Sequence, residues 1–155
     1  MNEAFRQFVE VLHPSFERLI AMAPASPTAI PRDAPSACIY LLSEGDSHLY
    51  TGRTRHLRQR MRNQAAPGST HNQAALAFKL ACENCDRKTV PYVKGEGRAA
   101  LAIDPQFVSA FSAAKARVRQ MQLRFVEELD PTRQALLEIY VSVTLRTPYN
   151  DFDTH

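Results

Sequence analysis

The sequence contains few of the residues on which several classes of protein depend. Its 155 residues include no tryptophan, three cysteines and five glycines. Three cysteines are an odd number and too few for a disulfide framework, so we expect a reducing compartment. The scattered glycines form no glycine-rich phosphate loop, which argues against nucleotide hydrolysis of the P-loop type.

Long hydrophobic runs are also missing. Residues 1–23 carry charges throughout and lack the uninterrupted apolar stretch of a signal peptide or a membrane span. The sequence therefore predicts a cytoplasmic protein with no membrane partner.

Charge of one sign is not in large excess, but it is unevenly distributed. Nineteen basic residues stand against 16 acidic ones, and a net charge of +3 does not by itself indicate a polyanionic partner. One window, residues 53–62, nevertheless holds arginine at every second or third position and no acid. Such a window indicates a basic face that binds nucleic-acid phosphates, although a solvated helix face gives the same pattern. The residues are Arg53, Arg55, Arg58, Arg60 and Arg62.

The chain length and its 45% hydrophobic residues fit one domain with an N-terminal extension. Residues 1–36 are expected to form a helical segment and a proline-rich strap that pack on the core, and residues 37–155 the main domain. Apolar residues at helical spacing begin at Phe5, and Pro14 is expected to divide this stretch into two helices. Four prolines between residues 23 and 37 predict an extended connector.

Residues 38–42 and 48–51 have the composition of two strands around an acidic turn. A three-residue loop with Ser43 facing Ser47 would place Tyr40 directly opposite Tyr50, on one face of the sheet. A loop of two or four residues would instead put the two tyrosines on opposite faces. The three-residue loop is our prediction.

Helix signals recur along the rest of the chain. Asp104 and Asp130 each precede a proline, the combination of an N-cap with proline at the first helical position. A first helix is expected after Gly52, with Leu57 on its inner face, and a second over residues 71–85. Further helices are expected to begin at Asp104 and at Asp130, the last running to about Leu145. Residues 121–127 are expected to form a strand.

The last predicted helix carries an unusual acid. Residues 136–145 are apolar nearly all round, so we expect this helix to be buried on more than one side. Glu138 lies within that stretch. A buried carboxylate costs several kcal/mol unless it is paired, hydrogen-bonded or bound to a metal.

Together these residues resemble the GIY-YIG nuclease superfamily. The resemblance rests on "CIY" at 38–40, "YTG" at 50–52, the arginine-rich segment that ends at Arg60, Glu138, and "TPYN" ending at Asn150. It implies an α+β fold with a GIY-YIG-like three-stranded antiparallel sheet flanked by helices. The N-terminal helices would be an extension, and the helices before the third strand an insertion.

The resemblance also implies an activity and a set of roles. The chain would be a metal-dependent endonuclease that hydrolyses phosphodiester bonds of DNA with a single Mg²⁺ (or Mn²⁺). Tyr40 would be the general base with Tyr50 beside it, and Arg60 would stabilise charge on the scissile phosphate. Glu138 would be the sole protein ligand of the metal, and Asn150 would brace the site. Arg53, Arg55, Arg58 and Arg62 would bind the nucleic acid.

Three positions depart from the family pattern. Cys38 replaces a glycine and Thr51 an isoleucine, both at positions that vary in the superfamily. Gln64 stands where several active members have a histidine, and His71 could supply an imidazole from the next helix instead. Without an imidazole, activity would be weak.

Two other interpretations stay open. The chain could be a catalytically weak or inactive member that binds nucleic acid, or another protein, through the same basic face. It could also be a toxin-like effector nuclease with a partner inhibitor. No zinc finger or helix-turn-helix is visible, so residues 65–120, the N-terminal helices or a partner protein would supply any specificity.

Overall fold

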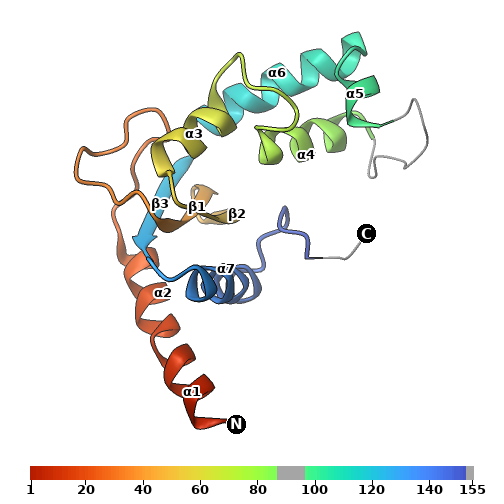
Figure 1. Ribbon diagram of the computed structural model, residues 1–155. Coiled ribbons are helices and arrows are strands. Elements are labelled where there is room, and N and C mark those ends of the chain that lie inside the picture. Colours follow the sequence, from red (N-terminus) through yellow and green to blue (C-terminus); the bar gives the residue numbers. More distant parts are fainter. Residues whose placement is uncertain (87–96, 153–155) are drawn as a thin grey trace. The chain divides into compact units, whose positions relative to one another are not determined.

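The computed structural model describes residues 1–86 and 97–152, which divide into two compact units (Figure 1). The first comprises Met1–Arg58 and Met121–His155 and contains the sheet; the second, Gln59–Gln120, is helical. The elements in chain order are α1 (Glu3–Glu10), α2 (Leu12–Ala21), β1 (Cys38–Glu44), β2 (Ser47–Thr54), α3 (Leu57–Ala65), α4 (Ala75–Asn84), α5 (Arg98–Leu101), α6 (Pro105–Arg119), β3 (Gln122–Glu127) and α7 (Pro131–Leu145).

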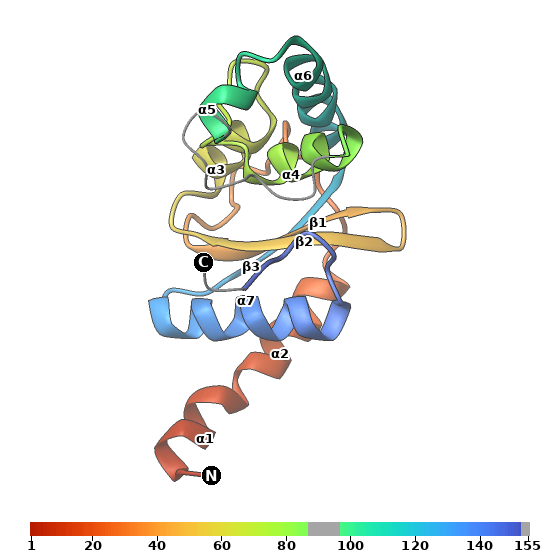
Figure 2. The same ribbon diagram turned by 90° about the vertical axis from the view of Figure 1, so that its right-hand side faces the viewer.

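The sheet of the first unit has three antiparallel strands in the order β2-β1-β3. Helices α2 and α7 lie along one of its faces (Figure 2). Ile39 and Leu41 of β1 pack there against Leu137 and Val141 of α7. Because side chains alternate along a strand, Tyr40 points to the opposite face. The fold is α+β with a three-stranded antiparallel sheet flanked by helices, as the sequence predicts.

The N-terminal stretch forms two helices, but they meet at Val11 and not at Pro14. Pro14 lies in the first turn of α2, where a missing backbone N–H breaks no helical hydrogen bond. Leu12 and Leu19 of α2 join the core that α7 forms with β1.

The proline-rich strap is tied to the first unit by backbone and side-chain bonds. Ala25 and Leu123 exchange two backbone hydrogen bonds of 2.8 Å at the outer edge of β3. Arg58 donates to the carbonyl of Ile30 at 3.1 Å and to that of Pro31. The strap therefore lies on the sheet edge at one end and is held by α3 further along.

The loop between β1 and β2 differs from the predicted one. Glu44 pairs with Ser47, so the loop has two residues, Gly45 and Asp46, and the predicted Ser43–Ser47 pair is wrong. Gly45 has φ +57°, the left-handed conformation that two-residue hairpin loops need and that glycine adopts at least cost. This loop alone would put Tyr40 and Tyr50 on opposite faces.

A β-bulge reverses that outcome. The register shifts next to Leu42, where Leu49 is an extra residue in β2. Beyond the bulge Leu42 faces Tyr50, and Tyr40 faces Gly52. The two tyrosines are therefore diagonal neighbours on one face. The predicted direct pairing is wrong, while their shared face is confirmed.

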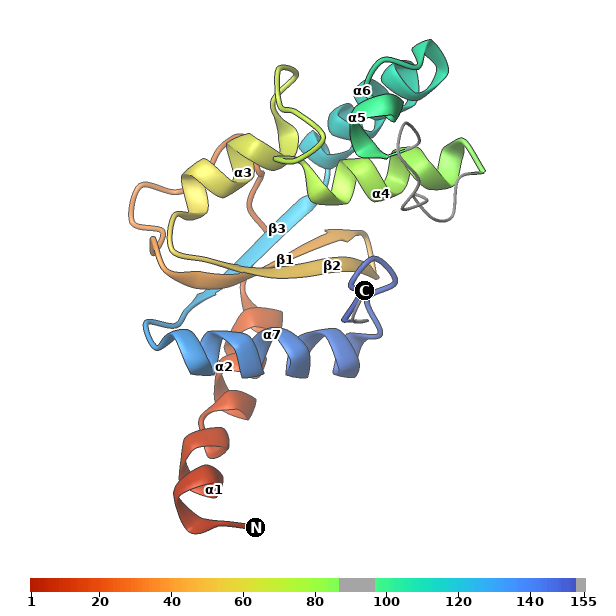
Figure 3. The same ribbon diagram turned by 45° about the vertical axis from the view of Figure 1, so that its right-hand side comes forward.

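Helices α4 and α6 pack together in the second unit (Figure 3), with the Phe78 and Phe107 ring centroids 5.3 Å apart. Helix α6 begins as predicted, because the Asp104 carboxylate accepts the Gln106 N–H at 2.9 Å. The helix predicted over 71–85 begins only at Ala75.

Two basic residues of α6 bind the end of α3 and the loop after it. Arg119 donates to the Ala65 carbonyl at 2.6 Å, and Lys115 donates to the carbonyls of Pro67 and Ser69 at 2.5 and 2.9 Å. Burial, and to a lesser degree the charge of Arg119, lower the pKa of Lys115. Arg119 thus satisfies a carbonyl of the last turn of α3, which lacks a helical partner, and Lys115 satisfies two carbonyls of the following loop.

Helix α7 runs from Pro131 to Leu145 with Asp130 as its N-cap, as predicted, and the Asp130 carboxylate accepts the N–H groups of Thr132 and Arg133. The expected burial on more than one side is wrong: Ile139 is 45% and Val143 67% exposed. Neither α7 nor any other helix in the described ranges combines the length and apolarity needed to cross a membrane.

Candidate active site

Tyr40 and Tyr50 lie side by side on the sheet face that points away from α7. Their ring centroids are 6.2 Å apart and the ring planes are tilted by 47°. This distance is within the range at which aromatic rings interact favourably. Tyr40 has no exposed surface, whereas Tyr50 is partly exposed.

Gly52 is the residue on which the Tyr40 ring rests. A Cβ added to Gly52 would lie 2.5 Å from Cζ and 2.9 Å from Cε1 of Tyr40, and would collide with its hydroxyl oxygen. Any side chain here would displace the ring. The glycine of "YTG" is therefore required by the tyrosine of "CIY", two positions that the register brings opposite each other.

Cys38 precedes Tyr40 by two residues and its side chain shares the same sheet face. Burial, with a smaller contribution from the charge of Glu127, raises the pKa of the Cys38 thiol to about 12. A thiol with such a pKa is protonated at neutral pH and is a poor nucleophile. Cys38, Cys82 and Cys85 are all free thiols.

Asn150 fixes the backbone of β2 at Thr51, the middle residue of the second tyrosine motif. Its Oδ1 accepts the Thr51 N–H at 2.9 Å, and its Nδ2 donates to the Thr51 carbonyl at 2.8 Å. The Thr51 hydroxyl in turn donates to the Tyr40 carbonyl at 2.9 Å. Since β2 is an edge strand, the amide of Asn150 takes the place of a neighbouring strand at this residue.

The turn after α7 delivers Asn150 to β2. Arg146 adopts the left-handed conformation (φ 52°, ψ 47°) and ends the helix, and the Thr147 N–H bonds the Ser142 carbonyl at 3.2 Å. The Thr147 hydroxyl lies 2.9 Å from Ser142 Oγ and donates to Asn150 Oδ1 at 2.7 Å. Pro148, which cannot continue a helix, is the signal of this turn in the sequence.

The bonds of Asn150 predict a stability loss in Asn150→Ala. Three hydrogen bonds disappear and the buried Thr51 amide loses its partner, so unfolding should become easier by about 2 kcal/mol. Urea denaturation measures the change. Asn63→Ala, which removes only a bond to Gln59 on α3, is the control and should shift stability by less than about 0.5 kcal/mol. Equal shifts in the two variants would contradict the bracing role.

Glu138 is paired with Arg53. Its Oε2 lies 3.3 Å from Arg53 Nε, with side-chain exposures of 18% for Glu138 and 50% for Arg53. Arg53 faces Ile39 across the β1–β2 pair, so both lie on the side of the sheet that α7 covers. The structure thus places Glu138 and the Tyr40–Tyr50 pair on opposite sides of β2, a separation that the sequence did not reveal.

The acids of the chain restrict which metal it could hold. The described residues contain no group of three or more histidine, cysteine, aspartate or glutamate side chains arranged for a metal. A zinc centre needs such a group, whereas Mg²⁺ is commonly held by one or two carboxylates, waters and substrate phosphates. Glu138 fits the second pattern, with Arg53 as the competitor for its oxygen.

The other arginines of the basic segment differ in their surroundings. Arg55, Arg58 and Arg62 are exposed, as nucleic-acid contacts require. Arg58 already donates to the strap carbonyls, so it also has a structural task. The Arg53 side chain is half-exposed to solvent and pairs with Glu138.

Three predicted site residues, Arg60, Arg62 and His71, belong to the second unit, and so does Gln64, which stands in place of the family histidine. Arg60 donates to the Gln73 carbonyl at 3.5 Å. Gln64 is fully buried, and its Oε1 accepts the Leu76 N–H at 3.2 Å, so it caps the start of α4. His71 was expected on the next helix, but it lies in the turn before α4. The capping role of Gln64 has no sequence signal, because it depends on a contact 12 residues away.

The geometry thus gives three groups: the Tyr40–Tyr50 pair with Tyr40 on Gly52, the Asn150–Thr51 clamp and the Arg53–Glu138 ion pair. In comparisons with family models, curated proteins and solved structures, nothing matched this chain.

Proposed function

We propose that this chain is a metal-dependent endonuclease of the GIY-YIG type that hydrolyses phosphodiester bonds of DNA. The observation that supports it most is the fit of the Tyr40 ring over Gly52 with the Tyr50 ring beside it, which links the two tyrosine motifs by direct contact. An aromatic ring over an edge-strand glycine also occurs in ordinary sheets, so the support comes from the two residues lying in the two tyrosine motifs of the resemblance. Asn150 adds a brace to the residue between Tyr50 and Gly52.

The two phenols have different access to water. A general base must come within hydrogen-bond distance of the water whose proton it takes. Tyr50 is partly exposed and can meet that water, while Tyr40 is buried behind it. The resemblance gives the base role to Tyr40. The burial favours Tyr50 for the contact with water and Tyr40 for holding the Tyr50 ring in place.

Cationic groups have to lower the cost of ionising a phenol, whose ordinary pKa is about 10. Glu138, on the α7 side of β2, would hold a single Mg²⁺, which supplies Lewis-acid stabilisation of phosphate charge and a more acidic water. Because the phenols lie on the other side of β2, this metal would act on the phosphate and the water and not on the phenol. Arg60 carries the planar, permanently charged guanidinium that suits a phosphate in the transition state. Arg55 and Arg62, both exposed, would bind other phosphates of the DNA.

The direct test is incubation of supercoiled plasmid with the purified protein and Mg²⁺ or Mn²⁺. We expect metal-dependent nicking that EDTA stops and that falls about 100-fold or more in Tyr50→Phe, because proton transfer is lost. Tyr40→Phe should lose less, since its ring stays on Gly52. Tyr140→Phe is the control, because it removes a hydrogen bond between α7 and His13 of α2, on the sheet face that points away from Tyr40 and Tyr50.

A second function has its own observation in favour. The Arg53 guanidinium forms an ion pair with the carboxylate that would hold the metal. If this pair persists, Glu138 binds no metal and the domain binds DNA without cutting it. Such a domain would show metal-independent affinity that falls steeply with salt. Absence of nicking together with such binding would replace the endonuclease proposal with this one.

A further inference from the structure

The outer edge of β3 is only partly covered. Strand β1 pairs with one side of β3, and the other side is an edge of the sheet. The strap adds to that edge at a single residue, where Ala25 and Leu123 exchange two hydrogen bonds of 2.8 Å. Backbone groups alternate in direction along a strand, so those of Phe125 and Glu127 point outward as those of Leu123 do.

Beyond Leu123 the edge of β3 carries outward backbone groups that neither β1 nor the strap pairs. The Phe125 N–H meets the sulfur of Met22 at 3.2 Å. Within the described residues, neither the Phe125 carbonyl nor the Glu127 N–H has a backbone or side-chain hydrogen bond. This acceptor and donor flank Val126, and one residue of an added parallel strand bonds both at once. The edge is therefore ready for a strand at this point.

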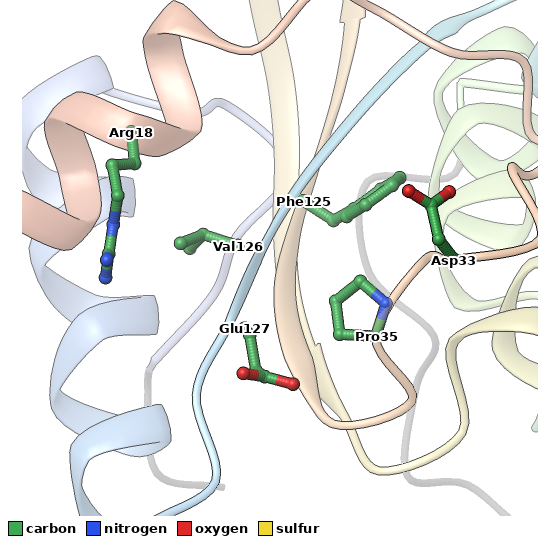
Figure 4. Close-up of a pocket in the computed structure, with 6 residues that line it drawn as sticks. All are labelled: Arg18, Asp33, Pro35, Phe125, Val126 and Glu127. Atoms are coloured by element: carbon green, nitrogen blue, oxygen red, sulfur yellow. The ribbon is translucent and has the colours of Figure 1, made fainter.

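A pocket of about 420 Å³ lies at this position (Figure 4). Phe125 points toward Asp33 and Pro35 of the strap, while Val126 lies on the side of Arg18 from α2. The strap and α2 thus form two walls, and the open edge of β3 lies between them. An extended backbone fits such a groove because its own side chains alternate between the walls.

The charged residues that line the pocket determine which side chains a bound peptide should carry. Asp33 and Glu127 are both exposed, and among the described residues Arg18 is the one basic side chain that lines the pocket. The local charge is therefore negative in a chain whose net charge is +3. A basic peptide would therefore be attracted to this pocket.

We propose that the Phe125–Glu127 edge is a docking site for an extended, basic peptide segment of another protein, which adds to β3 as a further strand. Basic side chains would face Asp33 and Glu127, and the alternating apolar ones would cover Val126. This interaction is independent of the proposed endonuclease activity, since Tyr40, Tyr50 and Glu138 take no part in it. A partner held here would bring the domain to its target.

The test uses the full chain labelled with ¹⁵N and a ten-residue peptide of alternating lysine and valine. Titration should shift the Glu127 amide resonance and slow its hydrogen exchange at least about tenfold. A glutamate and valine peptide of the same length should bind at least tenfold more weakly, as anisotropy of labelled peptides measures. The lysine and valine peptide with N-methylated backbone should not bind, because strand pairing needs its N–H groups.

Two variants separate the backbone bond from the charge. Glu127→Pro removes the outward N–H without touching the bonds to β1, a position where an edge strand tolerates proline. It should abolish binding of the lysine and valine peptide, while Glu127→Gln, which loses only the charge, should weaken binding less. The ¹⁵N spectrum of each variant shows whether it folds. The double variant Asp33→Lys, Glu127→Lys should prefer the glutamate and valine peptide.

Three results would overturn the proposal. One is no change at the Glu127 amide with millimolar lysine and valine peptide. Another is unchanged binding by a folded Glu127→Pro variant. The third is protection of this edge by the protein alone at high concentration, which would make a second copy of the chain its occupant.

Discussion

Replacing Glu138 with glutamine should reduce metal-dependent nicking at least about 1,000-fold. The substitution keeps the shape of the side chain and removes the negative charge, so the only protein carboxylate proposed for the metal is lost. Stabilisation of phosphate charge by a bound cation contributes several kcal/mol, and each 1.4 kcal/mol is a tenfold change in rate. Plasmid nicking at saturating Mg²⁺ measures the loss.

The loss has to be separated from unfolding. The Arg53–Glu138 pair is partly exposed, and such pairs contribute about 1 kcal/mol or less to stability. Glu138→Gln should therefore keep its urea midpoint nearly unchanged. Glu10→Gln, which removes an exposed carboxylate paired with Arg6 on α1, is the matched control and should cut plasmid like the wild type.

Metal binding gives a readout that does not depend on cleavage. Titration with Mn²⁺, followed by its electron spin resonance, should show one site in the wild type and none in Glu138→Gln. A variant that still binds Mn²⁺ and still nicks plasmid would contradict the role of Glu138. A wild type that neither binds Mn²⁺ nor nicks would favour the nucleic-acid-binding alternative.

Local signals in the sequence predict the helices well. Asp104 and Asp130 each cap a helix that begins at the next residue. An N-cap bonds backbone N–H groups only two and three residues away, so its signal is local. Pro14 was less informative, since proline is tolerated in a first turn and so marks a helix start as readily as a break. Signals of this range are contained in a short stretch of sequence.

The hairpin shows where such reasoning fails. The shared face of Tyr40 and Tyr50 was predicted from a three-residue loop, but it arises from a two-residue loop and an extra residue, Leu49. Two shifts of one residue cancel, so the correct face followed from an incorrect register. A bulge depends on the strand and chain segments around it, and no local pattern announces it.

The candidate site depends even more on distant contacts. Asn150 reaches Thr51 across 99 positions of sequence, and the resemblance gives Asn150 a bracing role without naming Thr51 as its partner. The Arg53–Glu138 pair follows from which face of the sheet α7 covers. Neither the apolar stretch of α7 nor the arginine spacing contains that information.

Gly52→Ala tests the contact on which the proposed site depends, and we expect it to lower the free energy of unfolding by at least about 2 kcal/mol. Alanine is otherwise preferred to glycine in a strand by about 0.5–1 kcal/mol, so the loss must come from the collision with the Tyr40 ring. Gly68→Ala is the control, because a Cβ there meets nothing within 4 Å. Its urea midpoint should stay constant or rise slightly.

A double-mutant cycle attributes the cost of Gly52→Ala to one neighbour. In a Tyr40→Leu background the hydroxyl and the outer ring atoms that a Cβ would meet are gone, so Gly52→Ala should cost little there. An equal cost in both backgrounds would mean that Gly52 is needed for the β2 backbone itself. A coupling of about 2 kcal/mol would instead show that the glycine is kept for the tyrosine, and that "CIY" and "YTG" form one structural unit.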